Sequence, residues 1–182
     1  FSEVYNPQMA IKVLSEVRKT YPTASLLMIG GSVGGEECFS QTQQLAESMG
    51  LSGAVEFTGK LTKNEWIARS AGGNIFINTT NADNTPVSVI EAMALGLPVA
   101  STNVGGIPYV IADGDNGLLV EAGDVKAMVK SIVRIAEDNA LCAGLSQAAI
   151  NASRKYFSTL YIGTIILIFA MFFSPFILFV FH

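Results

Sequence analysis

Residues 83–99 read DNTPVSVIEAMALGLPV, and this stretch decides the fold. It opens with a polar loop, after which Thr85 is the expected cap and Pro86 the expected first residue of a helix over 86–95. Gly96 stands just past the end of that helix, where glycine adopts the left-handed conformation at little cost. The apolar residues that follow predict a short strand. A loop, a helix and a strand in this order are typical of a parallel sheet covered by helices.

The same alternation of helices and strands extends over residues 6–157. A continuous apolar run, as expected of a parallel strand that is covered on both faces, predicts a strand at 25–30. Further strands are predicted at 54–58, 74–78, 98–101 and 117–120. Amphipathic segments predict helices at 6–21, 36–49, 86–95, 124–137 and 139–156, and Asn6 is the expected N-cap of the first of them, with Pro7 at its first position. A short helix is expected to start from a capping box at Thr62 and Glu65. The predicted fold class is α/β, with a parallel sheet and helices on both faces.

The composition limits both the size of the fold and the class of its partners. A chain of 182 residues is long enough for one α/β domain but too short for two full domains of this kind. The formal net charge is −4, and no basic cluster is longer than Arg154-Lys155. A nucleic-acid backbone needs a larger patch of positive charge, so nucleic-acid binding is not expected.

The start of the expected helix over 86–95 has the features of an anion site. The backbone N–H groups of Val87, Ser88 and Val89 are expected to be unpaired, and the positive end of the helix dipole adds to their attraction for phosphate. Glu91 shares this helical face, where it would repel phosphate but can accept hydrogen bonds from sugar hydroxyls. The pattern favours a nucleotide or a nucleotide sugar. The spacing fits equally well an alternative in which Thr85 and Pro86 only start a helix and Glu91 is a solvated surface residue.

A glycine-rich loop at residues 30–35 (GGSVGG) follows the first expected strand. It stands between a strand and a helix, as a phosphate-binding loop must. Its spacing, however, matches neither the dinucleotide fingerprint nor the P-loop, which requires Gly-Lys-Ser/Thr. By itself the loop fits a flexible connector at least as well.

Three motifs carry a family resemblance: the run at 83–98, Asn-Val-Gly-Gly-Ile-Pro at 103–108, and Asp-Gly-x-x-Gly-Leu-Leu-Val at 113–120. Together they resemble the C-terminal domain of the family 4 glycosyltransferases, and the similarity extends over about residues 6–157. The resemblance implies a Rossmann-like domain over 1–157 that is the C-terminal, donor-binding half of a GT-B fold without its first strand. It also implies the N-terminal GT-B domain as a missing partner.

The resemblance assigns roles to two acidic residues, which are the expected catalytic residues. Glu91 matches a position that would hold the ribose hydroxyls of the donor. Asp83 matches a second acidic position, where the family usually has Glu, and it reaches less far toward the donor sugar because it is shorter by one methylene.

The remaining donor-binding roles are implied by the same resemblance. Backbone groups at 86–89 would bind the diphosphate, residues 30–31 would line the nucleotide site, and residues 59–60 would lie near the base. The expected donor-binding residues are Gly30, Gly31, Gly59, Lys60, Thr85, Pro86, Val87, Ser88, Val89 and Glu91.

The implied function is transfer of a hexosyl group from a UDP- or GDP-linked sugar to a glycan or lipid-linked acceptor, with retention at the anomeric carbon. The nucleotide sugar is a substrate, so no cofactor is expected. No metal is expected either, because the sequence has no pair of carboxylates of metal-binding type. Two alternatives remain open: a sugar-nucleotide epimerase of the same architecture, and a non-catalytic nucleotide-sugar-binding relic. We expect residues 1–182 by themselves to be incomplete for catalysis.

Residues 158–182 form a second expected unit, an apolar C-terminal helix. The part at 160–181 has no charged residue and is about as long as a helix that spans a membrane. Arg154-Lys155 precede it, and positive residues on the inner side would leave the domain cytoplasmic, at the inner face of the membrane. The alternative is a segment that is not native and results from a change of reading frame.

Overall fold

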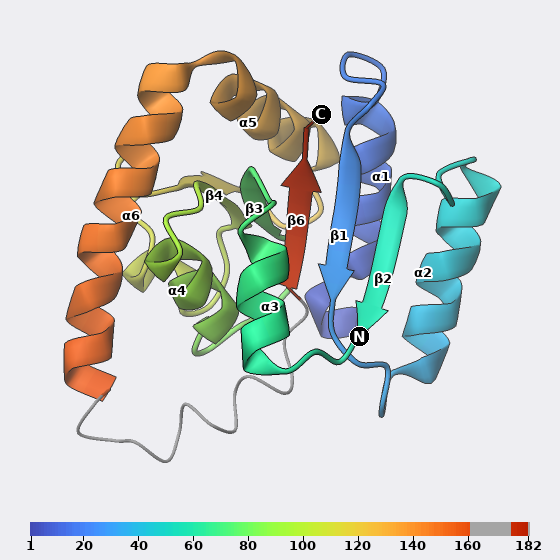
Figure 1. The fold of residues 1–182 in the computed structure, drawn as a ribbon, viewed down its shortest axis with the longest axis horizontal. Helices are drawn as coiled ribbons and strands as arrows, with labels where there is room; N and C mark the ends of the chain where they lie inside the picture. The colour runs from blue at the N-terminus through green and yellow to red at the C-terminus, as the bar shows by residue number, and fades with distance from the viewer. Residues whose placement is uncertain (161–175, 182) are drawn as a thin grey trace.

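A computed structural model describes residues 1–160 and 176–181. The described residues form a six-stranded sheet with helices on both faces, in the order β2-β1-β6-β3-β4-β5 (Figure 1). The strands are β1 (Ser25–Ile29), β2 (Val55–Gly59), β3 (Ile75–Asn78), β4 (Val99–Thr102), β5 (Leu118–Val120) and β6 (Phe176–Val180). The pairs β1–β2, β3–β4 and β4–β5 are parallel, which confirms the predicted fold class.

The helices follow the strands in the predicted alternation. They are α1 (Pro7–Val17), α2 (Glu36–Ser48), α3 (Lys63–Ser70), α4 (Val87–Ala94), α5 (Val125–Glu137) and α6 (Asn139–Leu160), with short 3-10 helices η1 (Glu3–Tyr5) and η2 (Ile107–Tyr109). Several predicted ends differ from the observed ones, most by a single residue. The larger differences are that α1 ends at Val17, before the predicted 21, and that α6 extends to Leu160, beyond the predicted 156, while α4 begins at Val87, one residue after the predicted 86.

Two apolar clusters fill the space between the sheet and its helices. Side chains of α1 and α5 pack on one face of the sheet, and side chains of α4 pack on the other, where Trp66 of α3 joins them. Strand β6 serves both clusters because successive side chains of a strand point to opposite faces: Ile177 and Phe179 join the first, and Leu178 joins the second. Strand β6 therefore contributes buried side chains to the core on both faces of the sheet.

Side-chain caps set the starts of α1 and α3 as the sequence predicts. The Asn6 side chain accepts a hydrogen bond from the backbone N–H of Met9 at the start of α1. Before α3, Thr62 and Glu65 form the reciprocal capping box. Each cap pairs backbone donors that a helix start would otherwise leave without a partner, and so fixes where the chain enters the helix.

The expectation of an apolar membrane helix over 160–181 is wrong for residues 176–180, which form β6. This strand runs antiparallel to both neighbours, with Leu178 opposite Leu27 of β1 and Phe76 of β3. The Leu178 side chain is fully buried. Residues 161–175 of that prediction lie outside the described residues. Among the residues that are described, no helix is long and apolar enough to cross a membrane.

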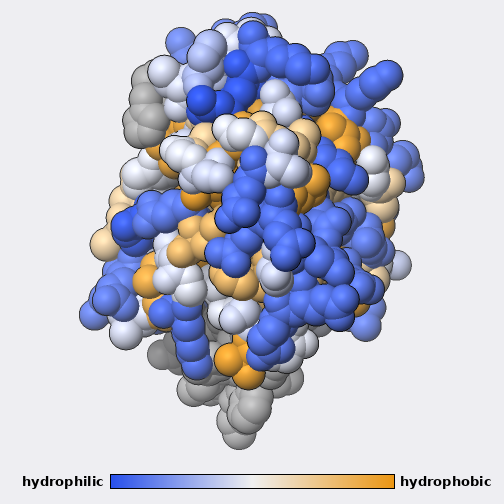
Figure 2. Space-filling view, turned by 90° about the vertical axis from the view of Figure 1, so that its right-hand side faces the viewer, coloured by the Kyte–Doolittle hydropathy of each residue, from blue (hydrophilic) through white to orange (hydrophobic). Residues whose placement is uncertain are grey.

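The side of the molecule over α2 is largely hydrophilic, with only scattered apolar residues (Figure 2). On α2 itself Cys38, Thr42 and Ala46 are buried, and the exposed positions carry Glu, Gln and Ser side chains. This division is that of an amphipathic helix with one face on the core and the other in water.

We predict that Leu178→Ala lowers the free energy of unfolding of the full chain by about 2–5 kcal/mol, because it removes buried methyl groups from a central strand. Urea unfolding in detergent-free buffer measures the change. Leu95→Ala is the matched control, since the Leu95 side chain is 38% exposed. Equal stabilities of the two variants would mean that residues 176–180 are not part of the core.

Candidate functional site

The carboxyl ends of the parallel strands meet at one edge of the sheet, which is the lower edge in Figure 1. From β1 the chain continues to β2 on one side, and from β3 it continues to β4 and β5 on the other. The order of the strands therefore reverses between β1 and β3. In sheets of this kind, ligands bind outside the carboxyl ends of the strands at such a point.

The two glycine-containing loops that the sequence singled out lie side by side at this edge. The backbone N–H of Gly30 donates to the carbonyl oxygen of Gly59 over 3.1 Å. A Cβ atom on Gly31 would lie 3.9 Å from the Cβ of Lys60. Gly59 has φ 69°, in the left-handed region that glycine enters without strain. The four predicted residues of these loops are thus brought together by β1 and β2.

The start of α4 differs from the prediction in two respects. Thr85 does not cap the helix; Pro86 takes the N-cap position, and no side chain makes a capping hydrogen bond there. The N–H of Val87 donates to the carbonyl oxygen of Thr85 over 2.8 Å, so this donor has a partner, contrary to the prediction. The N-terminus of α4 still carries the positive end of the helix dipole, without a side-chain carboxylate to cap it.

Asp83 is half-buried in the loop that precedes α4. Its side-chain oxygen Oδ1 accepts a hydrogen bond from the backbone N–H of Thr85 over 3.0 Å. Burial raises the pKa of Asp83, and the hydrogen bond from Thr85 opposes that shift. Burial also raises the pKa of Tyr5, and the nearby negative charge of Asp83 adds to the effect. The charge of the Asp83 carboxylate thus acts on the N-terminal segment through Tyr5.

Gly105 and Gly106 let a second loop pack tightly against Asp83 and Asn84. The N–H of Gly106 donates to the carbonyl oxygen of Asp83 over 2.6 Å. A Cβ on Gly105 would lie 2.1 Å from that same oxygen, and a Cβ on Gly106 would lie 2.3 Å from the carbonyl oxygen of Asn84. The Gly-Gly pair thus fixes the backbone in front of α4.

Glu91 lies on α4 and is half-buried, which excludes the interpretation of a fully solvated surface residue. Burial raises the pKa of Glu91 to about 7, and the positive charge of Lys63 partly offsets the shift. Sequence reasoning missed Lys63, the first residue of α3. Its position directly after the Thr62 cap was the available signal, but its electrostatic effect on Glu91 depends on the tertiary fold, which spacing along the chain does not reveal.

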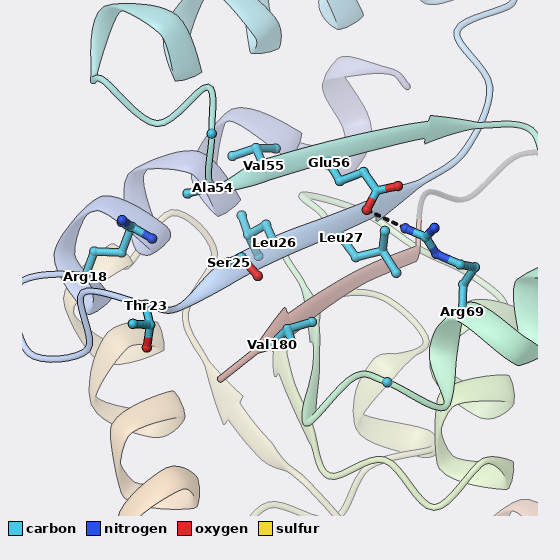
Figure 3. A pocket seen from close by; sticks show the side chains of 12 residues that line it. Arg18, Thr23, Ser25, Leu26, Leu27, Ala54, Val55, Glu56, Arg69 and Val180 are labelled. Carbon is cyan, nitrogen blue, oxygen red and sulfur yellow. Dashed lines mark ion pairs between the residues drawn. The ribbon is translucent and has the colours of Figure 1, made fainter. Parts of the chain in front are cut away.

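A hollow lies at the opposite, amino edge of the sheet (Figure 3). Its lining includes Ser25 at the start of β1 and Val180 at the end of β6. The two arginines beside it are engaged within the protein, since Arg18 donates to the carbonyl oxygen of Ala24 and Arg69 pairs with Glu56. None of the predicted site residues lines this hollow.

The fold and the loops at the carboxyl edge define a Rossmann-like α/β domain. The sequence profile described as glycosyl transferases group 1 matches residues 1–152, and the chain belongs to this family. D-inositol 3-phosphate glycosyltransferase of Corynebacterium aurimucosum is 24% identical over 152 residues, which cover 82% of this chain and 36% of the relative. Sulfoquinovosyl transferase SQD2 of Arabidopsis thaliana is 27% identical over 152 residues, covering 82% and 28%. The chain spans about a third of the length of these curated relatives.

Solved structures of GT-B enzymes share the fold. The C-terminal domain of a group 1 glycosyl transferase (LpcC) from Francisella tularensis superposes with a TM-score of 0.77 at 21% identity, covering 86% of this chain and 82% of that one. Anabaena Alr3699/HepE in complex with UDP-glucose has the same TM-score and identity and covers 85% of this chain and 42% of its own. The fold is therefore that of the C-terminal domain of GT-B glycosyltransferases.

We predict that Gly106→Ala destabilises the protein by about 1–3 kcal/mol, the usual cost of forcing an extra methyl group into a packed site. Gly144→Ala on α6 is the control, because a Cβ there meets no atom within 4 Å and alanine favours the helix. Thermal unfolding of both variants measures the difference. A Gly106→Ala protein as stable as Gly144→Ala would contradict the close packing of the two loops.

The raised pKa of Glu91 predicts a pH-dependent effect of Glu91→Gln on stability. The pKa of Glu91 is about 7 in the folded protein, and its reference value of 4.5 stands for the unfolded chain. Between these pH values the folded state binds more protons than the unfolded state, so the free energy of unfolding falls as pH rises through this range. Glutamine cannot ionise, so the variant should be more stable than the parent by about 1–3 kcal/mol at pH 8. The gain should shrink toward pH 5.

Urea unfolding at pH 5 and pH 8 measures this gain. Glu47→Gln is the matched control, because Glu47 is exposed on α2 and its substitution should leave stability unchanged at both values. A gain for Glu91→Gln that is the same at pH 5 and pH 8 would show that the carboxyl group does not titrate in this range.

Proposed function

We propose that this chain is the donor-binding domain of a retaining hexosyltransferase and that it binds a UDP- or GDP-linked sugar at the carboxyl edge of its sheet. The observation that carries the proposal is the half-buried Glu91 on α4, a helix that follows β3 and whose N-terminus lacks a side-chain cap. The two glycine loops that meet after β1 and β2 lie at the same carboxyl edge of the sheet and support it. Membership of the group 1 glycosyl transferases supports this assignment.

Each part of the donor has a matching group at this edge. The diphosphate would bind at the start of α4, where the helix dipole and the backbone at 86–89 favour negative charge. The ribose hydroxyls would donate hydrogen bonds to Glu91, and the nucleotide would lie along Gly30 and Gly31, with Gly59 and Lys60 nearer the base. Asp83 would accept hydrogen bonds from hydroxyls of the transferred sugar.

The chemical step would rest on stabilisation of the leaving diphosphate rather than on a protein nucleophile. Charge develops on the diphosphate as the bond to the sugar breaks, and fixed donors at a helix N-terminus stabilise such charge without reorganising. A glycan or lipid-linked acceptor would receive the hexosyl group. We expect slow transfer by residues 1–182 alone, since the implied N-terminal GT-B domain would supply the acceptor side of the cleft.

Calorimetric titration of the full chain with UDP, GDP and their hexose conjugates tests donor binding. We expect saturable binding of one nucleotide class at pH 8, and binding weakened at least tenfold by Glu91→Gln, because loss of a hydrogen bond to a charged group costs about 1.5–3 kcal/mol. Glu47→Gln should bind like the parent. A folded parent chain that binds none of these compounds would refute the proposal.

The pKa of Glu91 also predicts how affinity depends on pH. An ionised carboxylate can accept from both ribose hydroxyls, whereas the neutral form loses acceptor capacity, so affinity for the nucleotide sugar should rise as pH increases through about 7. With a pKa of about 7, the ionised fraction rises about tenfold between pH 6 and pH 8, which sets the expected gain. Titrations of the sugar conjugate at both pH values measure it, and Glu91→Gln should show no such rise.

A further inference from the structure

Two adjacent threonines, Thr79 and Thr80, lie buried directly after β3, at the carboxyl edge of the sheet. A buried hydroxyl group costs free energy unless it is hydrogen-bonded, whereas valine would fill a similar space without that requirement. The partners of these hydroxyls therefore show what valine could not provide. They belong mainly to residues 3–6, which precede α1 and which we call the pre-helix segment.

Both hydroxyls bind backbone carbonyl groups of the pre-helix segment. The hydroxyl oxygen of Thr79 lies 3.0 Å from the carbonyl oxygens of both Tyr5 and Asn6. The hydroxyl oxygen of Thr80 lies 3.0 Å from the carbonyl oxygen of Val4. Each hydroxyl has a single proton and so donates to one carbonyl at a time. Three consecutive carbonyls of the segment are thus within reach of two buried donors.

Asn81 completes the attachment of the pre-helix segment. Its backbone N–H donates to the carbonyl oxygen of Val4 over 2.7 Å, and its side-chain Nδ2 donates to that of Glu3 over 3.4 Å. The side chain of Asn6 donates to Oδ1 of Asn81 over 3.3 Å, while its own oxygen caps α1. Asn6 has φ 45°, in the left-handed region that asparagine enters more readily than most residues. These contacts fix the segment on the end of β3.

The Thr80 side chain also shapes the backbone just before Asp83. Its hydroxyl oxygen lies 2.8 Å from the carbonyl oxygen of Ala82 and accepts a hydrogen bond from the N–H of the same residue over 3.3 Å. The carbonyl oxygen of Thr80 in turn accepts from the hydroxyl of Thr102, at the end of β4, over 2.6 Å. The backbone that leads into Asp83 is therefore anchored to β4 through Thr80.

Thr79 influences Asp83 by a different route. The negative charge of Asp83 acts on Tyr5, so the phenol group of Tyr5 belongs to the electrostatic environment of the carboxylate. The backbone of Tyr5 is within reach of the Thr79 hydroxyl. Loss of that hydroxyl should therefore change the position of Tyr5 relative to Asp83.

We propose that Thr79 and Thr80 are positioning residues of the donor site, whose buried hydroxyls lock the pre-helix segment onto the end of β3 and so hold Asp83 where it contacts the transferred sugar. The inference rests on the proposed function, in which Asp83 binds sugar hydroxyls. The nucleotide is assigned there to other residues, so the two threonines should affect binding of the sugar and not of the nucleotide. They act through Asp83 and need not touch the ligand.

Amide hydrogen exchange, followed by NMR, tests the positioning without any ligand. The N–H groups of Thr85 and Gly106 donate to the side chain and to the backbone of Asp83, so their exchange rates report on its position. We expect both amides to exchange about fivefold faster, or more, in Thr79→Val and in Thr80→Val, the effect of losing one hydrogen bond. Thr79→Ser and Thr80→Ser keep the hydroxyl and should exchange at the parent rate.

Thr42→Val is the matched control, because Thr42 is buried on α2 and its hydroxyl donates to the carbonyl oxygen of Cys38. This variant also loses a buried hydroxyl but should leave exchange at Thr85 and Gly106 unchanged. Residues 26–28 of β1 are the internal reference for general unfolding. Unchanged exchange at Thr85 and Gly106 in the Thr79→Val and Thr80→Val proteins, or an equal acceleration at residues 26–28, overturns the proposal.

Calorimetric titration at pH 8 tests the consequence for the ligand. Thr79→Val should weaken binding of the UDP- or GDP-hexose by about fivefold or more and leave binding of the free nucleoside diphosphate within about twofold of the parent. Thr79→Ser should bind both compounds like the parent. In an Asp83→Ala background, Thr79→Val should cause no further loss, because the effects of residues that act through one another are not additive.

An equal loss for the conjugate and the free nucleotide, or a further loss in the Asp83→Ala background, overturns the proposal. A folded parent chain that binds no nucleotide refutes the proposed function instead. The exchange rates at Thr85 and Gly106 then decide alone whether the two threonines position Asp83.

Discussion

The pairing of β6 with both β1 and β3 is the interaction on which the rest of the described structure depends. Among the described strands, β2 and β1 form one half of the sheet, β3, β4 and β5 form the other, and β6 joins them. Buried backbone N–H and C=O groups must be paired, so neither half can leave its inner edge bare. The distance between the glycine loop after β1 and the loop after β3, and hence the shape of the candidate site, follows from this one strand.

The site itself combines tight backbone packing with an unfavourably placed carboxyl group. Gly105 and Gly106 let the loop at 83–85 lie against its neighbour, and this contact holds the start of α4 in place. Glu91 is held one turn further along, where burial disfavours its charged form even beside Lys63. Buried ionisable groups with a shifted pKa are typical of functional sites, and this supports the proposed role of Glu91 in ligand binding.

The sequence predicted the elements that local interactions determine. The capping signals at Asn6 and Thr62 and the apolar runs of β1 to β5 depend on near neighbours in the chain, and these predictions are confirmed. The membrane-helix prediction was wrong for 176–180 because an uncharged run of Ile, Leu and Phe fits a lipid-facing helix and a central strand equally well. The electrostatic effect of Lys63 on Glu91 and the packing of Gly106 on Asn84 depend on the tertiary fold, so spacing along the chain could not reveal them.

Mapping of amide chemical shifts in the full chain during titration with a UDP-sugar and a GDP-sugar tests the central claim most directly, because it locates the binding site without assuming it. The account predicts saturable changes, for one of the two donors, concentrated at Gly30–Gly31, Gly59–Lys60 and 87–91. Changes concentrated instead around Ser25 and Arg69, at the amino-edge hollow, or no saturable changes with either donor, would contradict it.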